Sequence, residues 1–196
     1  GTGALSNSSA SGSVTAASTA DSVGGLVGQF QMSGGLSNSQ SGSADSTVSG
    51  GNYTGGLIGW TNISAGFTHD AGNGQIISFR GASVSGGLWV GGLFGSNGTA
   101  TLTGLSSSAS VSATGSAGGL AGYTGGNVSN ASASGTVSGR TYVGGLIGQA
   151  AGSNTTLTDV SATGNVTNTT VNGEAAGLVG WASGAGILRG SASGTV

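Results

Sequence analysis

The sequence predicts an all-β protein, a parallel β-solenoid (β-helix) of about six to seven coils with roughly 30 residues in each coil, and the crossover rule for parallel strands makes a right-handed coil the expectation. Two alternating motifs and an unusual composition carry this prediction. One motif is a five-residue unit of Gly, Gly, Leu, an apolar residue and Gly, and the other is a ten-residue unit that ends in valine. Repeats of this length are typical of solenoids, in which each repeat forms one layer that its neighbours bury.

The five-residue unit occurs six times, and its central leucine never changes. The copies occupy residues 24–28, 55–59, 91–95, 118–122, 144–148 and 176–180, and Ala176 replaces the first glycine of the last copy. Glycine on both sides of the leucine lets neighbouring backbones come close, so we expect the leucines to form an inward ladder. They are Leu26, Leu57, Leu93, Leu120, Leu146 and Leu178.

The opposite face of this unit is a candidate contact surface, because it carries apolar and aromatic side chains. Its residues are Val23, Ile58, Trp60, Phe94, Tyr123, Ile147 and Trp181. The competing interpretation is that a loop or a corner of the coil covers this face.

The ten-residue unit alternates small or apolar residues with Ser, Thr or Asn. Clear copies occupy residues 5–14, 102–111, 128–137, 157–166 and 187–196, and blurred copies occupy 36–48 and 75–84. Period-two alternation predicts a half-buried strand. The third position holds Asn7, Gly104, Asn130 or Asp159, residue types that tolerate a left-handed backbone, so a bend is expected there. Seven copies of the ten-residue unit alternate with six copies of the five-residue unit, so the sheet built by the ten-residue units is expected to have one additional strand.

Outward positions of the ten-residue units form rows of hydroxyl groups. The rows are Ser106, Ser108 and Ser110; Ser132, Ser134 and Thr136; Ser161, Thr163 and Asn165; and Ser191, Ser193 and Thr195. Such a face could bind glycans, order water as ice-binding solenoids do, or pack against another copy. A plain solubilising surface is the simplest interpretation.

Composition argues against several classes of protein. The chain has three Arg, no Lys and a net charge of −2, so no basic surface exists for nucleic acid. No apolar run is long enough to span a membrane. Cysteine is absent, so disulfides and thiolate-bound metals play no part. Regularly spaced Leu, Val, Ile and Trp argue against a disordered Gly/Ser linker, and the absence of Pro argues against collagen.

The repeat is interrupted at residues 61–75, and solenoid insertions often form loops on a binding side. This segment holds the single histidine, His69, followed by Asp70. Two adjacent residues rarely bind the same metal ion, and the other acidic residues are scattered along the chain. No serine lies in the G-x-S-x-G motif that surrounds a nucleophilic serine in hydrolases. We therefore expect no catalytic residues, no metal site, no cofactor and no enzymatic activity.

Sequons for N-glycosylation are frequent in this chain. They lie at Asn7, Asn52, Asn62, Asn97, Asn127, Asn130, Asn154, Asn165 and Asn168. In a secreted protein of a glycosylating organism, sugars there would replace the missing surface charge. A chain rich in Ser, Thr and Asn also generates sequons by chance, and an intact mass of 18.1 kDa would rule the modification out.

The alternation of GGLVG-like and LSNSSASGSV-like strands resembles the GLUG-motif repeats of large bacterial surface and secreted proteins. These repeats are found beside filamentous-haemagglutinin-like adhesins and in some surface proteases, outside the catalytic part. The resemblance extends over residues 1–196, and it weakens at residues 61–75 and at Ala176. It implies a right-handed β-solenoid that serves as a stalk, spacer or adhesive surface, and it brings no catalytic residues.

We therefore expect residues 1–196 to form one solenoid domain, a segment or mature unit of a larger secreted protein. The expected function is a non-catalytic structural or adhesive module at the cell surface or outside the cell. It would act by head-to-tail or lateral self-association or by contacts with other surface proteins. The alternatives are a carbohydrate- or ice-binding module, using the hydroxyl rows or the aromatic loop near Trp60 and Phe67, and the spacer domain of a secreted enzyme.

Overall fold

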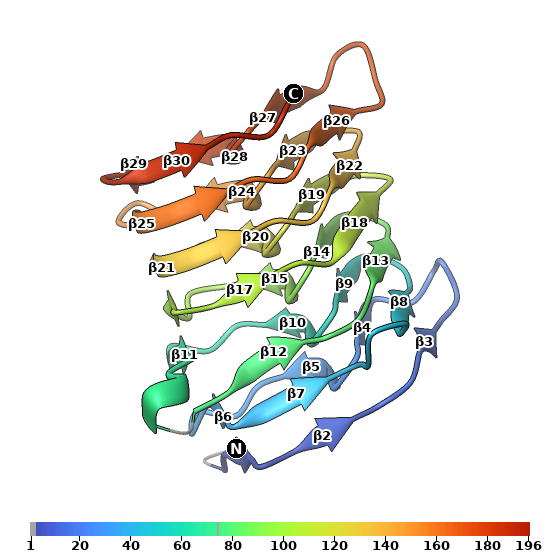
Figure 1. The fold of residues 1–196 in the computed structure, drawn as a ribbon, viewed down its shortest axis with the longest axis vertical. Helices are drawn as coiled ribbons and strands as arrows, with labels where there is room; N and C mark the ends of the chain where they lie inside the picture. Colours follow the sequence, from blue (N-terminus) through green and yellow to red (C-terminus); the bar gives the residue numbers. More distant parts are fainter. Residues whose placement is uncertain (1–2, 74) are drawn as a thin grey trace.

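The computed structural model describes residues 3–73 and 75–196, and this part of the chain winds into a parallel β-solenoid of about six turns (Figure 1). Strands of successive coils pair in parallel. Among the described residues the helical structure is one 3-10 turn, η1 (Ala71–Asn73), and no helix is long and apolar enough to cross a membrane. The predicted all-β solenoid class is confirmed, and its handedness stays a prediction.

Each coil passes through four stacks of strands, and the ten-residue units build the first stack, which we call the hydroxyl face. Its strands are β1 (Leu5–Ser6), β2 (Ser9–Ala10), β6 (Leu36–Ser37), β7 (Ser39–Ser41), β11 (Phe67–Thr68), β12 (Ile77–Phe79), β16 (Leu102–Thr103), β17 (Ser106–Ser107), β21 (Val128–Ala133), β25 (Thr156–Ala162), β29 (Gly186–Ile187) and β30 (Gly190–Ala192). Strands β29 and β30 pair with β25 and begin a seventh layer, which the other stacks lack.

The other three stacks contain six strands each. The valine sheet consists of β3 (Val14–Thr15), β8 (Thr47–Ser49), β13 (Ser83–Gly86), β18 (Ser110–Ala113), β22 (Val137–Gly139) and β26 (Val166–Asn168). The pre-leucine sheet consists of β4 (Ser22–Gly24), β9 (Tyr53–Gly55), β14 (Trp89–Gly91), β19 (Ser116–Gly118), β23 (Tyr142–Gly144) and β27 (Glu174–Ala176). The post-leucine sheet consists of β5 (Val27–Phe30), β10 (Ile58–Thr61), β15 (Phe94–Asn97), β20 (Ala121–Thr124), β24 (Ile147–Ala151) and β28 (Val179–Ser183).

The repeating leucines lie in the core. Leu57, Leu93, Leu120 and Leu146 are fully buried, and the leucines of the terminal coils are partly buried against the same core. Glycine is required beside them because the backbones of adjacent coils are close. A Cβ atom on Gly119, for example, would lie 2.3 Å from the carbonyl oxygen of Gly145.

The expected contact face needs correction at its aliphatic and phenylalanine positions. Val23, Ile58, Phe94 and Ile147 are at most 5% exposed and belong to the core. The cause is the bend at the second glycine and the leucine, which interrupts the strand alternation. The amides of Leu57 and Ile58 both donate to the carbonyl oxygen of Leu93, at 3.0 Å each. Two consecutive side chains are therefore buried at this bend, rather than one on each face.

The bend expected at the third position of the ten-residue unit is confirmed. The backbone φ angle is positive at each of these positions in five of the units, namely Asn7, Asn38, Gly104, Asn130 and Asp159. Asparagine, aspartate and glycine are the residue types that adopt this conformation at the lowest cost.

The interruption begins later in the chain than the sequence indicated. Thr61 is a buried residue of β10, and Phe67–Thr68 pairs with Leu102–Thr103 as the start of the third ten-residue unit. The Phe67 ring packs between those of Phe30 and Phe94, with centroid distances of 5.7 and 5.1 Å. This packing holds Phe67 in the coil, so the excursion inside that unit contains the described residues 69–73 and 75–76, and the second strand of the unit is β12.

We expect Leu120→Ala to lower the free energy of unfolding by about 2–5 kcal/mol, because the side chain is fully buried in a central coil. Leu26→Ala, in a partly buried terminal coil, should cost less. Urea unfolding followed by far-UV circular dichroism checks both values. Equal losses for the two variants would contradict the deeper burial of the leucine in the central coil.

Candidate functional site

Six partly exposed aromatic side chains flank the Gly-Gly-Leu bends and form an aromatic strip. Its members are Tyr53, Trp89 and Tyr142 of the pre-leucine sheet and Trp60, Tyr123 and Trp181 of the post-leucine sheet. The Trp89 ring lies 5.4 Å from that of Tyr53 and 4.9 Å from that of Tyr123. Tyr142 stacks on Trp181 at 5.4 Å. Three of the seven residues predicted for the contact face therefore do lie at the surface.

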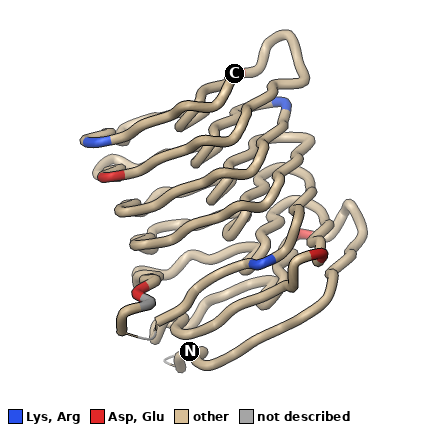
Figure 2. Tube along the Cα trace, viewed as in Figure 1, with Lys and Arg blue, Asp and Glu red and all other residues tan. Residues whose placement is uncertain are grey.

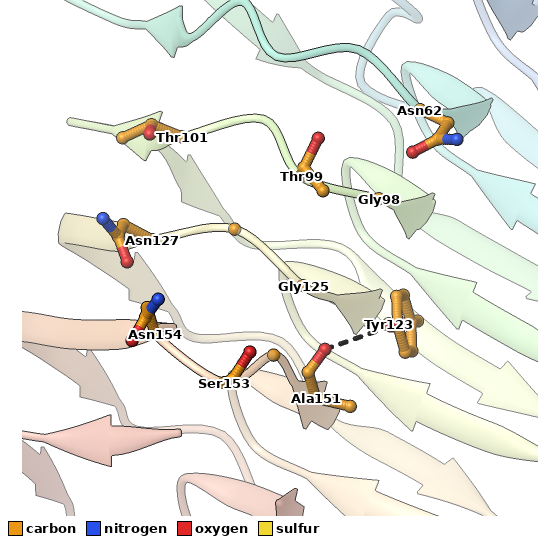
Figure 3. A pocket seen from close by; sticks show the side chains of 12 residues that line it. Asn62, Gly98, Thr99, Thr101, Tyr123, Gly125, Asn127, Ala151, Ser153 and Asn154 are labelled. Atoms are coloured by element: carbon orange, nitrogen blue, oxygen red, sulfur yellow. Dashed lines mark hydrogen bonds between the residues drawn. The ribbon is translucent and has the colours of Figure 1, made fainter. Parts of the chain in front are cut away.

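A shallow groove lies where the post-leucine strands turn towards the hydroxyl face (Figure 3). We call it the turn groove, and its volume is about 470 Å³. It extends from the end of β10 across the turns that follow β15, β20 and β24. Its lining residues are Asn62, Gly98, Thr99, Thr101, Tyr123, Gly125, Gly126, Asn127, Ala151, Gly152, Ser153 and Asn154.

Hydrogen bonds hold the turns of this groove in place. The Tyr123 hydroxyl donates to the carbonyl oxygen of Ala151 at 3.1 Å, and the Asn127 Oδ1 accepts from the amide of Thr156 at 2.9 Å. Beneath the groove, Asn97 is fully buried, and its Nδ2 donates to the Ala100 carbonyl oxygen and to Thr124 Oγ1 at 2.8 and 2.9 Å. The groove is therefore a preformed surface rather than a gap between loose loops.

The hydroxyl rows are outward, as the alternation requires. Ser106, Ser132, Ser161 and Ser191 are in register on four successive strands, and each is partly or fully exposed. The intervening Ser107, Ala133 and Ala162 are buried. The rows repeat at the interstrand spacing of about 4.8 Å.

Charged residues are sparse and mostly isolated along the chain (Figure 2). The exception is Asp159 with Arg189, which occupy the third position of successive ten-residue units. Arg189 Nε and Nη2 donate to the two carboxylate oxygens at 2.5 and 2.7 Å. These hydrogen bonds lower the pKa of Asp159; desolvation opposes them, and the charge of Arg189 adds to their effect. The same contacts raise the pKa of Arg189.

The histidine and the aspartate of the interruption serve its local structure. The amide of Ile77 donates to His69 Nδ1 at 3.1 Å. Asp70 accepts from the backbone amide and the side-chain amide of Asn73, which closes the turn of η1. Within residues 3–73 and 75–196, no three His, Cys, Asp or Glu side chains gather in a way that could hold a metal ion.

The predicted sequons differ in accessibility, and one needs correction. Asn97 is fully buried and uses its amide nitrogen in two hydrogen bonds, so a glycan cannot be attached there in the folded chain. The remaining eight are partly or fully exposed: Asn7, Asn52, Asn62, Asn127, Asn130, Asn154, Asn165 and Asn168.

Two successive stretches match one family model. The model of the GLUG motif matches residues 113–138 and again residues 139–167. Residues 113–167 carry two GLUG repeats. Each matched GLUG repeat begins near the end of a valine-sheet strand and continues to the corresponding strand of the next coil, so one repeat corresponds to one turn of the solenoid. No curated protein and no solved structure matches the sequence significantly.

Sequence reasoning missed half of the aromatic strip and the whole turn groove. Tyr53, Trp89 and Tyr142 each lie two residues before a Gly-Gly pair, and this fixed offset could have revealed them. Trp60, Tyr123 and Trp181 share the matching offset of three residues after the leucine. The groove has no comparable signal, because the Asn, Ser, Thr and Gly residues that line it also occur throughout the rest of the sequence.

We expect the Asp159 carboxyl to titrate below the ordinary aspartate value of 3.8. Because its pKa is lowered on folding, the pair contributes stability above the unfolded pKa, and this contribution is lost as pH falls through the folded value. The side-chain ¹³C shift of Asp159, followed against pH, measures the effect. Arg189→Gln should bring the titration back towards the ordinary value. An unchanged midpoint in that variant would show that Arg189 is not the cause.

Proposed function

We propose that this protein is a non-catalytic structural and adhesive module that works outside the cell or at its surface. In this proposal, the solenoid acts as a rigid building block that joins other chains through its ends and sides. The observation that carries the proposal is that the core columns continue to both ends of the solenoid. The fold and the GLUG repeats support a structural role.

The last layer leaves core positions exposed. Ile187 pairs with the buried Leu157 and continues its column, yet it is 47% exposed. Val196 lies at the position of the buried Val166 and is 69% exposed. At the other end, Leu5 and Val14 are only partly covered by the core. Another parallel layer on either end would remove this apolar surface from water, which favours stacking.

The terminal strands of the sheets also favour stacking with another chain. Strands β3, β4 and β5 are terminal in their sheets at one end, and β26, β27 and β28 are terminal at the other. A strand edge offers unpaired amide and carbonyl groups that can pair with another chain. The partial seventh layer adds a step, because it covers only the hydroxyl face. A second copy, or a strand from another surface protein, would fit this step.

We expect the isolated chain to self-associate with rising concentration through these ends. Ile187→Lys should weaken the association, because it places a charge in the apolar column that a new layer would bury. Leu188→Lys is the matched control, since Leu188 is the next residue, is 67% exposed and belongs to the outward column. Sedimentation velocity over a concentration series measures both. A wild-type chain that stays monomeric at high concentration excludes self-association.

The in-register hydroxyls favour a second candidate function, which is binding to ice. Rows spaced by about 4.8 Å between strands and about 7 Å along each strand can hold water in a regular array. The wild-type chain should then inhibit ice recrystallisation. Ser134→Tyr, in an exposed row, should abolish the effect, and Thr114→Tyr, exposed but outside the hydroxyl face, should retain it. Failure of the wild-type chain in this assay removes the candidate.

A further inference from the structure

We propose that the turn groove is a binding site for a neutral, linear oligosaccharide. This site lies on the side of the solenoid, away from the ends at which self-association is expected, so sedimentation and sugar binding test the two proposals separately. The argument rests on the chemistry of the lining, on its repetition from coil to coil and on its preformed geometry.

The lining is polar but carries no charge. Its polar side chains are amides and hydroxyls, and none of the twelve lining residues is Asp, Glu, Lys, Arg or His. Amide and hydroxyl groups both donate and accept hydrogen bonds, as the hydroxyl groups of a sugar do. An anionic ligand would find no Arg or Lys to pair with, and an apolar ligand would leave these groups unsatisfied.

The lining also repeats along the solenoid axis. Gly98, Gly125 and Gly152 follow β15, β20 and β24 in equivalent turns, and polar side chains accompany them in each coil. In Figure 3, Asn127 and Asn154 lie in neighbouring turns on the same side of the groove. Adjacent coils are about 4.8 Å apart, so a ligand lying along the axis would meet similar groups in each coil. A chain of sugar units fits this repetition better than a single small molecule.

Tyr123 supplies the aromatic surface that sugar rings often require. Its hydroxyl is held by the Ala151 carbonyl oxygen, and its ring packs on Trp89. An aromatic ring fixed in this way presents an apolar surface at low entropic cost. The apolar face of a sugar ring can stack on it while the sugar hydroxyls reach the amides.

Two amides are available for a ligand. The side chains of Asn62 and Asn154 are exposed, and neither forms a hydrogen bond with the described residues. Asn127, in contrast, is engaged with both the amide and the hydroxyl of Thr156. The backbone beneath is already fixed, since Thr155 Oγ1 donates to the Gly125 carbonyl oxygen at 2.7 Å. Binding therefore requires little reordering of the protein.

The test is calorimetric titration of the whole chain with a panel of neutral hexasaccharides, namely cello-, xylo-, laminari-, malto- and chitohexaose, together with hexagalacturonate as the charged probe. At least one neutral hexasaccharide should bind, and hexagalacturonate should bind at least about tenfold more weakly or not at all. The double variant Asn62→Ala/Asn154→Ala should weaken binding by about tenfold or more, because two hydrogen bonds are lost. Neither side chain supports the fold, so circular dichroism should be unchanged.

Matched controls locate the binding site. Thr114→Ala changes a second groove of about 460 Å³, which lacks both amide and aromatic side chains, and should leave affinity unchanged. Trp181→Ala changes the aromatic strip outside the turn groove and should also leave it unchanged. The proposal is overturned if none of the neutral hexasaccharides binds, if the double variant keeps wild-type affinity, or if hexagalacturonate binds as well as the best neutral probe.

Discussion

Close contact between backbones at the Gly-Gly-Leu bend is the constraint on which the rest of the structure depends. The glycines let one coil lie against the next with no side chain between them. This contact fixes the stacking, and the stacking places the same motif position of every coil in one column. Columns of buried leucine and valine then supply the core that no single coil could form. The outward motif positions are stacked in columns too, and these columns form the hydroxyl rows, the aromatic strip and the turn groove.

The fold was predictable because each coil repeats the same motifs at similar spacing. The spacing of the leucines, the alternation of the ten-residue unit and the residue types at its third position indicate the strands, the core and the bend. Asn7, Asn130 and Asp159 show this well, since the backbone conformation they favour is the one they adopt. A local preference confirmed in successive coils is much stronger evidence than the same preference in one loop.

What the sequence could not predict are features that depend on three-dimensional packing. Ile58 and Phe94 have the parity of an outward face, but the bend directs them into the core. The divided repeat around Phe67 predicts a loop, yet the Phe67 ring completes an aromatic column with Phe30 and Phe94 of other coils. The turn groove exists only because turns far apart in sequence are stacked, so no local motif marks it.

The paired residues at the third position explain why this surface holds so little charge. In a parallel, in-register stack, any charged residue type that the repeat retained would lie a few ångströms from its own copies and be repelled. The chain places Asn7 beside Asn38 and, at the other end, opposite charges on Asp159 and Arg189. A surface hydrated mainly by hydroxyl and amide groups is weakly affected by ionic strength. Such a molecule would keep the same contacts in fresh water and in brine.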